Sequence, residues 1–123
     1  MILVDTTFMI DALHPGTRSN RVVSNWLLAE ETVNVPALVW TELMIGDLPQ
    51  PTRDELHSLF PSPEPLFAAD ATKAAELFVR TGKRPGTLRE CLIAAVCLRV
   101  RARLATLAIQ NFNHFESFGL VLA

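Results

Sequence analysis

The chain has 123 residues, of which 50% are hydrophobic and 20% are charged, and its formal net charge is −2. This length and composition predict one domain with a buried core and exclude general disorder. No run of about 18 apolar residues occurs, and the chain does not open with a basic segment followed by an apolar block. We therefore expect no membrane span, no secretory signal and a cytoplasmic location.

The charges are unevenly distributed along the chain. Residues 1–79 carry 11 acidic and 4 basic side chains, whereas residues 80–103 carry seven basic side chains against Glu90 alone. Because contacts to phosphate groups come mainly from Lys and Arg, the second segment is a candidate surface for a polyanion. A solvated helix face next to a charged loop explains the same residues equally well.

Apolar runs, capping residues and helix breakers predict alternating strands and helices. Two helices begin with a capping-box pattern, Thr52 with Glu55 and Thr87 with Glu90. Short apolar strands between helices indicate an α/β fold, with a mainly parallel sheet that helices cover on both faces. In chain order, we predict a strand at 1–4, a helix ending at 13, a helix around 22–27, a strand at 32–35, helices at 36–46 and 52–60, a strand at 66–68, helices at 70–82 and 87–101, and strands at 104–106 and 119–122.

Three acidic residues interrupt apolar patterns. Asp5 closes the first strand, Glu42 lies within an apolar helix, and Glu90 lies in the first turn of the longest helix. Ligands of parallel α/β folds bind outside the carboxyl ends of the strands, which makes the position of Asp5 notable. Each residue also has a structural explanation: Asp5 as a helix cap, Glu42 as an exposed helix residue, and Glu90 as part of a capping box with Thr87.

Four segments, taken in order, resemble the PIN-domain ribonucleases and most closely the VapC-type toxins of toxin–antitoxin pairs. Each segment alone is a weak signal, but four in this order and spacing are fairly specific. The resemblance covers nearly the whole chain. It implies a single PIN domain over residues 1–123, with a three-layer α/β/α fold and a short, mainly parallel sheet of four to five strands. The segments are Val4-Asp5-Thr6-Thr7, Thr41-Glu42-Leu43-x-x-Gly46, Glu90-x-Leu92-Ile93-Ala94-Ala95, and Leu104-Ala105-Thr106 with Asn111-Phe112.

The resemblance implies a carboxylate cluster that holds Mg²⁺ or Mn²⁺, hard cations that prefer oxygen ligands. Asp5, Glu42 and Glu90 would be the catalytic ligands, and Asn111 would add a carbonyl oxygen. In such a site the metal ion polarises the scissile phosphate and lowers the pKa of the attacking water.

Two threonines would support this site without touching the metal ion. Thr6 would orient Asp5 or a water molecule through its hydroxyl group, and Thr106 would hydrogen-bond a ligand or a phosphate. A simple cap at the end of a strand is an equal alternative for Thr106.

The implied function is a metal-dependent endoribonuclease toxin that a cognate antitoxin protein inhibits. In this family the antitoxin lies across the catalytic groove, and homodimers are usual. The candidate contacts to RNA phosphates lie in the basic segment and are Arg80, Lys83, Arg84 and Arg89.

The sequence departs from the family pattern at three positions. Glu90 stands where the family usually has Asp, and Ala108 and Asn111 leave the cluster without its fourth carboxylate. Removing a negative charge weakens the binding of a divalent cation. The second hypothesis is therefore a catalytically weakened PIN protein that binds RNA or an antitoxin.

Two other features of the sequence carry less weight. The three histidines, His14, His57 and His114, have no ligand spacing, so we expect them at the surface. A phosphoacceptor receiver domain of this length is disfavoured because no Asp follows residue 70 and the only lysines are Lys73 and Lys83.

Overall fold

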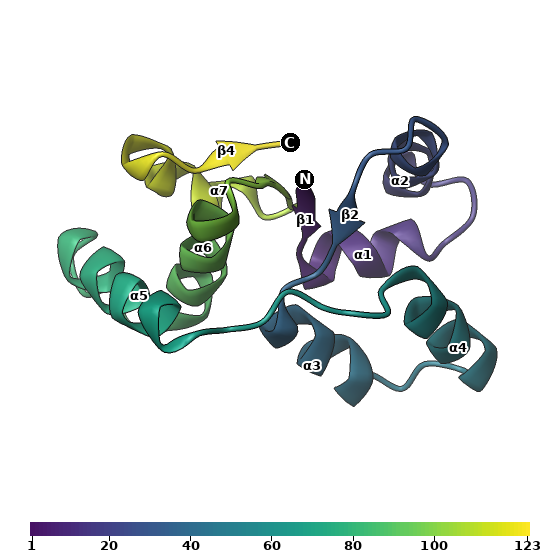
Figure 1. Cartoon of the computed structure of the whole chain (residues 1–123), viewed down its shortest axis with the longest axis horizontal. Coiled ribbons are helices and arrows are strands. Elements are labelled where there is room, and N and C mark those ends of the chain that lie inside the picture. Colours follow the sequence, from purple (N-terminus) through teal and green to yellow (C-terminus); the bar gives the residue numbers. More distant parts are fainter.

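The computed structural model describes all 123 residues (Figure 1). The strands are β1 (Ile2–Val4), β2 (Val33–Asn34), β3 (Arg103–Ala105) and β4 (Val121–Leu122). The helices are α1 (Thr6–Ala12), α2 (Arg18–Leu28), α3 (Ala37–Ile45), α4 (Gln50–Leu59), α5 (Ala68–Arg80), α6 (Leu88–Val100), α7 (Ile109–Phe112) and the 3₁₀ helix η1 (Asn113–Phe118).

The four strands form one parallel sheet in the order β2-β1-β3-β4. In the centre, Leu3 of β1 is in register with Asn34 on one side and Leu104 on the other. All three residues of β1 are fully buried, as a continuous apolar run predicts for a strand covered on both faces. The predicted α/β class and the mainly parallel sheet are confirmed.

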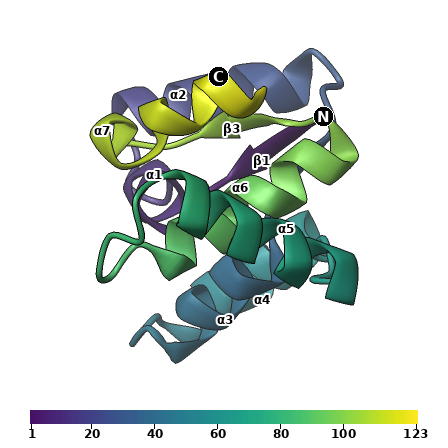
Figure 2. The same ribbon diagram turned by 90° about the vertical axis from the view of Figure 1, so that its left-hand side faces the viewer.

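Helices cover both faces of this sheet. In Figure 1, α5 and α6 lie to the left of the central strands, and α1 and α2 lie to the right. Figure 2 shows β1 and β3 side by side, while α3 and α4 lie together at the bottom of both views. This arrangement leaves the carboxyl ends of β1 and β3 next to each other, because the two strands are parallel and paired.

The strand predicted at 66–68 is wrong. Residues 65–67 have no regular structure, and the nearest strand-like pairing is an isolated parallel bridge between Glu64 and Pro36. A proline stands on each side of Glu64 and has no N–H to donate, so pairing cannot continue along the sheet. Phe67 is 52% exposed and directly precedes α5, which begins at Ala68.

Both predicted capping boxes are also wrong. Helix α4 begins two residues earlier than predicted, at Gln50, with proline in its first turn. At the start of α6, the Thr87 hydroxyl group donates to the Arg84 carbonyl oxygen at 2.8 Å and does not cap the helix. Glu90 is therefore not held by a capping box. The segment between Thr106 and Gly119, for which no element was predicted, forms α7 and η1.

Both cysteines, Cys91 and Cys97, are free and buried in α6. No helix has both the length and the apolar character needed to cross a membrane.

An ion pair between the buried Asp70 and the solvent-accessible Arg99 joins α5 to α6. Asp70 is 2% exposed, and its two carboxylate oxygens accept hydrogen bonds from Nε of Arg99 at 2.9 and 3.1 Å. Arg99 also donates to the Pro65 carbonyl oxygen at 2.9 Å and lies over the Phe67 ring. One guanidinium group thus fixes the proline-rich segment against the two helices.

We expect Arg99→Leu to lower the free energy of unfolding by about 3 kcal/mol, because it leaves the buried Asp70 carboxylate without a counter-charge. Arg103→Leu is the matched control, since Arg103 pairs with Glu31 at 3.6 Å between two exposed side chains. Its loss should cost less than about 1 kcal/mol. Urea denaturation measures both, and similar values for the two variants would contradict the role given to Arg99.

Candidate active site

Asp5 directly follows β1 and is 1% exposed. Its Oδ1 accepts hydrogen bonds from the Phe8 backbone N–H at 3.0 Å and from the Thr7 hydroxyl group at 3.1 Å. Its Oδ2 accepts from the Thr106 hydroxyl group at 2.5 Å. The predicted cap of α1 is therefore present, and the same carboxylate also ties the end of β1 to the end of β3.

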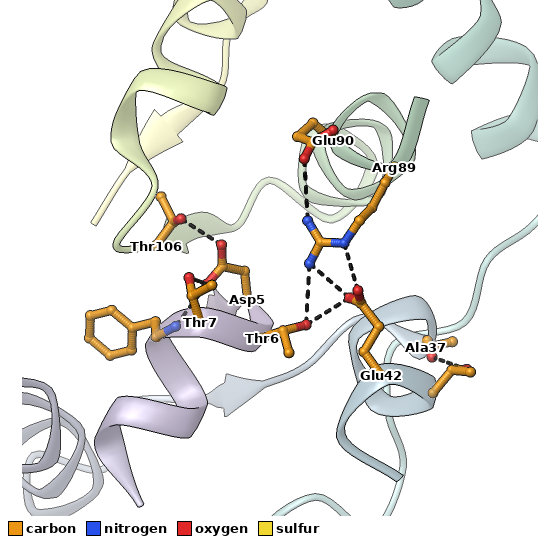
Figure 3. A network of polar contacts seen from close by, with 10 residues as sticks. Asp5, Thr6, Thr7, Ala37, Glu42, Arg89, Glu90 and Thr106 are labelled. Atoms are coloured by element: carbon orange, nitrogen blue, oxygen red, sulfur yellow. Dashed lines mark hydrogen bonds and ion pairs between the residues drawn. The ribbon is translucent and has the colours of Figure 1, made fainter. Parts of the chain in front are cut away.

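Glu42 lies on α3 and forms a two-point ion pair with Arg89 of α6. The guanidinium Nε donates to Oε2 at 2.8 Å and Nη2 donates to Oε1 at 2.7 Å (Figure 3). The Thr6 hydroxyl group donates to the same Oε1 at 2.7 Å and accepts from Arg89 Nη2 at 3.2 Å. Thr6 thus orients Glu42, whereas the sequence suggested Asp5 or a water molecule as its partner.

Glu90 approaches the same guanidinium group from α6. Its Oε1 lies 3.5 Å from Nη1 of Arg89, and its Oε2 is buried without a hydrogen-bond partner. The structure therefore brings Asp5, Glu42 and Glu90 to one end of the sheet, with Thr6 and Arg89 between them (Figure 3).

A polar pocket of about 180 Å³ lies beside Glu90 and has no apolar lining residue. Asn111, the predicted fourth ligand, lines this pocket. Ala108 is half-buried, and its backbone N–H donates to the Thr106 hydroxyl group at 3.0 Å. The lining residues are Arg84, Gly86, Thr87, Glu90, Gln110, Asn111 and His114.

The four candidate RNA contacts have different surroundings. Arg89 is bound to Glu42, and Arg80 pairs with Glu76 at 3.3 Å on the outer face of α5. Lys83 and Arg84 are exposed in the loop before α6, and Arg84 lines the polar pocket.

Sequence reasoning missed two features of this site. It took Arg89 for a contact to phosphate, although the Glu42 partner lies 47 residues away and no local pattern points to the pair. It also placed His114 at the surface. His114 is half-buried in the polar pocket with its Nε2 unpartnered, and burial lowers its pKa, with the Arg84 charge adding to the shift and Glu90 opposing it.

The profile of the PIN domain family matches residues 2–108. The chain belongs to the PIN domain family. No curated protein sequence matches it significantly.

Solved toxin–antitoxin structures have the same PIN fold. The chain resembles VapBC2 from Rickettsia felis, bound to a promoter DNA fragment, with 21% identity, coverage of 100% of this chain and 98% of that chain, and a TM-score of 0.77. FitAcB from Neisseria gonorrhoeae is 22% identical, the match covers 100% of this chain and 97% of that chain, and the TM-score is 0.74. VapC20 from Mycobacterium tuberculosis is a toxin that cleaves the sarcin-ricin loop. It is 18% identical, the match covers 100% of this chain and 98% of that chain, and the TM-score is 0.66.

PIN nucleases generally use divalent metal ions, and the side chains of Asp5, Glu42 and Glu90 are of the chemical type that binds such ions. Carboxylate oxygens are the ligands that Mg²⁺ and Mn²⁺ prefer, and the buried Oε2 of Glu90 lacks any other partner. As the side chains lie, however, the Arg89 guanidinium group stands between Glu42 and Glu90.

The hydrogen bonds from Arg89 are the main reason that the pKa of Glu42 is lowered. Burial opposes them, while the Thr6 hydroxyl group and the positive charge of Arg89 add to the shift. In return, hydrogen bonding to Glu42 raises the pKa of Arg89. A carboxylate with a lowered folded-state pKa stabilises the fold above its ordinary pKa of about 4.3, and this contribution is lost as the pH falls through the folded-state value.

We therefore expect Arg89→Gln to raise the pKa of Glu42, as followed by NMR titration of the side-chain carboxyl carbon. The variant should also lose less stability than the wild type when the pH falls below about 4, since the stabilising pair is already absent. Arg103→Gln, which removes the same charge far from Glu42, should leave this pKa unchanged. An unshifted Glu42 in Arg89→Gln would contradict the assignment.

Proposed function

We propose that this chain is a toxin-type PIN ribonuclease, which hydrolyses RNA phosphodiester bonds with Mg²⁺ or Mn²⁺ and is inhibited by a cognate antitoxin. The observation that supports this proposal is the placement of Asp5, Glu42 and Glu90 at the same end of the sheet in a PIN fold, although no three of its acidic groups are close enough to share a metal ion as the side chains lie. Asp5 has a structural role as the cap of α1, but the placement of Glu42 and Glu90 on either side of one guanidinium group brings like charges together, which costs free energy unless a cation is present.

In the proposed site, Asp5, Glu42 and Glu90 hold the metal ion, and Asn111 adds an oxygen from the polar pocket. When bound, the ion supplies charge neutralisation at the scissile phosphate and a water molecule of lowered pKa. Thr106 and Thr6 keep the Asp5 and Glu42 carboxylates in place, through the hydrogen bonds described above. Such fixed ligands limit the reorganisation that metal binding requires.

The RNA strand would approach over the loop before α6. Lys83 and Arg84 are exposed there and present positive charge next to the acidic cluster. Cations beside the cluster offset its repulsion of the phosphate backbone. Single-stranded ends and loops suit this site, since their backbone is accessible from one side.

The antitoxin partner is proposed by analogy with the solved neighbours, which are toxin–antitoxin assemblies. Homodimer formation is proposed as well. This proposal rests on the resemblance to the VapC-type toxins, in which homodimers are usual.

The second candidate function is a PIN protein that binds RNA or antitoxin with weakened catalysis. It is favoured by Ala108 and Asn111, which supply no fourth carboxylate. The two functions share a fold and partners, so only the chemistry separates them.

We expect the wild-type protein to cleave single-stranded RNA at millimolar Mn²⁺ and to lose this activity with a chelator. Glu42→Gln and Asp5→Asn should lower the cleavage rate at least 100-fold, because each removes a charged ligand. Glu55→Gln, an exposed residue of α4, is the matched control and should keep the wild-type rate. Cleavage is read from end-labelled RNA on denaturing gels. RNA binding without cleavage would favour the second candidate, whereas metal-independent cleavage would contradict the proposed mechanism.

A further prediction concerns the missing carboxylate. We expect Asn111→Asp to bind Mn²⁺ at least tenfold more tightly than the wild type, because a unit charge about 4 Å from a cation contributes several kcal/mol at a partly screened site. Ala108→Asp should help less, since a new polar group at a half-buried position costs stability. Calorimetry measures both affinities, and neither gain should occur together with Glu42→Gln. Unchanged affinity in both folded variants would show that these positions do not face the metal ion.

A further inference from the structure

We propose that Arg89 is the resident cation of the acidic cluster, so that a divalent metal ion enters only after the guanidinium group has left Glu42. This inference rests on the metal-dependent function proposed above. It gives Arg89 a role in metal occupancy rather than in RNA binding.

The first argument is the position of the guanidinium group. It uses both oxygens of Glu42, at 2.7 and 2.8 Å, and reaches Oε1 of Glu90 at 3.5 Å. It therefore bridges two carboxylates that come from different helices, α3 and α6 (Figure 3). A shared divalent cation would have to bind the same oxygens.

The second argument is that the two cations exclude each other. A planar guanidinium group with two parallel hydrogen bonds occupies the lone pairs that point from the Glu42 carboxylate toward Glu90. Mg²⁺ binds carboxylate oxygen at about 2.1 Å and tolerates little distortion. A metal ion at that distance would lie within contact of the guanidinium nitrogens, where the two positive charges repel each other.

The third argument is that no other cation forms an ion pair with the cluster. Among the ion pairs of the chain, only those of Arg89 reach Glu42 or Glu90, and Asp5 receives its hydrogen bonds from hydroxyl groups and a backbone N–H. Removing Arg89 therefore leaves the three carboxylates without an ion-pair partner, with Arg84 of the polar pocket as the cation nearby. Such a cluster attracts a divalent ion more strongly than one that already holds a cation.

The fourth argument is that Arg89 can leave without unfolding α6. Its side chain is 32% exposed, so a change of rotamer can carry the guanidinium group into solvent. The backbone of the helix and the neighbouring Glu90 can stay in place. The cost of metal entry is then the loss of the Glu42 and Thr6 hydrogen bonds.

Mn²⁺ calorimetry on the metal-free protein, without RNA, tests this proposal. Arg89→Gln should bind Mn²⁺ at least tenfold more tightly than the wild type, and Arg103→Gln, with the same change in net charge, should bind like the wild type. In Arg89→Gln with Glu42→Gln the gain should disappear, since the ion then lacks its shared ligand. Arg89→Lys keeps the positive charge but cannot form the two-point contact, and its affinity should lie between those of the wild type and Arg89→Gln.

Two results would overturn the proposal: equal Mn²⁺ affinity in wild type and Arg89→Gln, or a gain that survives in the double variant, which would place the metal ion elsewhere. Circular dichroism establishes that each variant is folded, and Arg89→Lys carries the comparison if Arg89→Gln is not. The readout separates this inference from the proposed nuclease function. Tight Mn²⁺ binding by Arg89→Gln without RNA cleavage would refute the nuclease alone, whereas cleavage with equal affinities would refute the role of Arg89 alone.

Discussion

Carboxylates that meet at the end of a parallel sheet require a positive charge or hydrogen-bond donors close by, because like charges in a partly buried site repel each other strongly. The chain meets this requirement in two ways. Asp5 is surrounded by neutral donors, two of them threonine hydroxyl groups, while Glu42 and Glu90 share one guanidinium group. The two sets of hydrogen bonds hold different elements together. Asp5 ties the end of β1 to the end of β3, and Arg89 ties α6 to Glu42 of α3 and to Thr6 of α1.

The two carboxylate oxygens of Asp5 have different partners, so this residue can combine a structural role with a chemical one. Oδ1 caps α1 through the Phe8 backbone N–H, and Oδ2 is bound by Thr106 from the neighbouring strand. A helix cap stabilises by about 1 kcal/mol, so this aspartate has a structural role in addition to any metal binding. Asp5→Asn would keep part of the cap of α1, so it tests the loss of the negative charge with less loss of stability than Asp5→Ala would cause.

The parts of the structure that the sequence predicts well are those with a local physical signal. The buried β1 strand follows from a run of apolar residues, and the position of Asp5 follows from its place at the end of that run. The same reasoning fails at residues 66–68, where apolar composition suggests a strand but the adjacent prolines remove the N–H groups that pairing needs. The pairing of Arg89 with Glu42 lies outside the reach of local patterns, because it depends on how α3 and α6 pack together. Family resemblance supplied the acidic residues but gave no reason to expect a basic residue among them.

The two edges of the sheet are very short. Strands β2 and β4, which form these edges, contain two residues each, and Pro36 follows soon after β2. An exposed edge strand is a template on which another chain can add a strand. The tendency to aggregate in this way increases with the number of unpaired backbone N–H and C=O groups along the edge. Because each edge strand offers so few unpaired backbone groups, another strand could form few hydrogen bonds with this sheet. Association of two copies through the sheet edges is therefore disfavoured, and helices and loops are the surfaces that remain for contacts with other macromolecules.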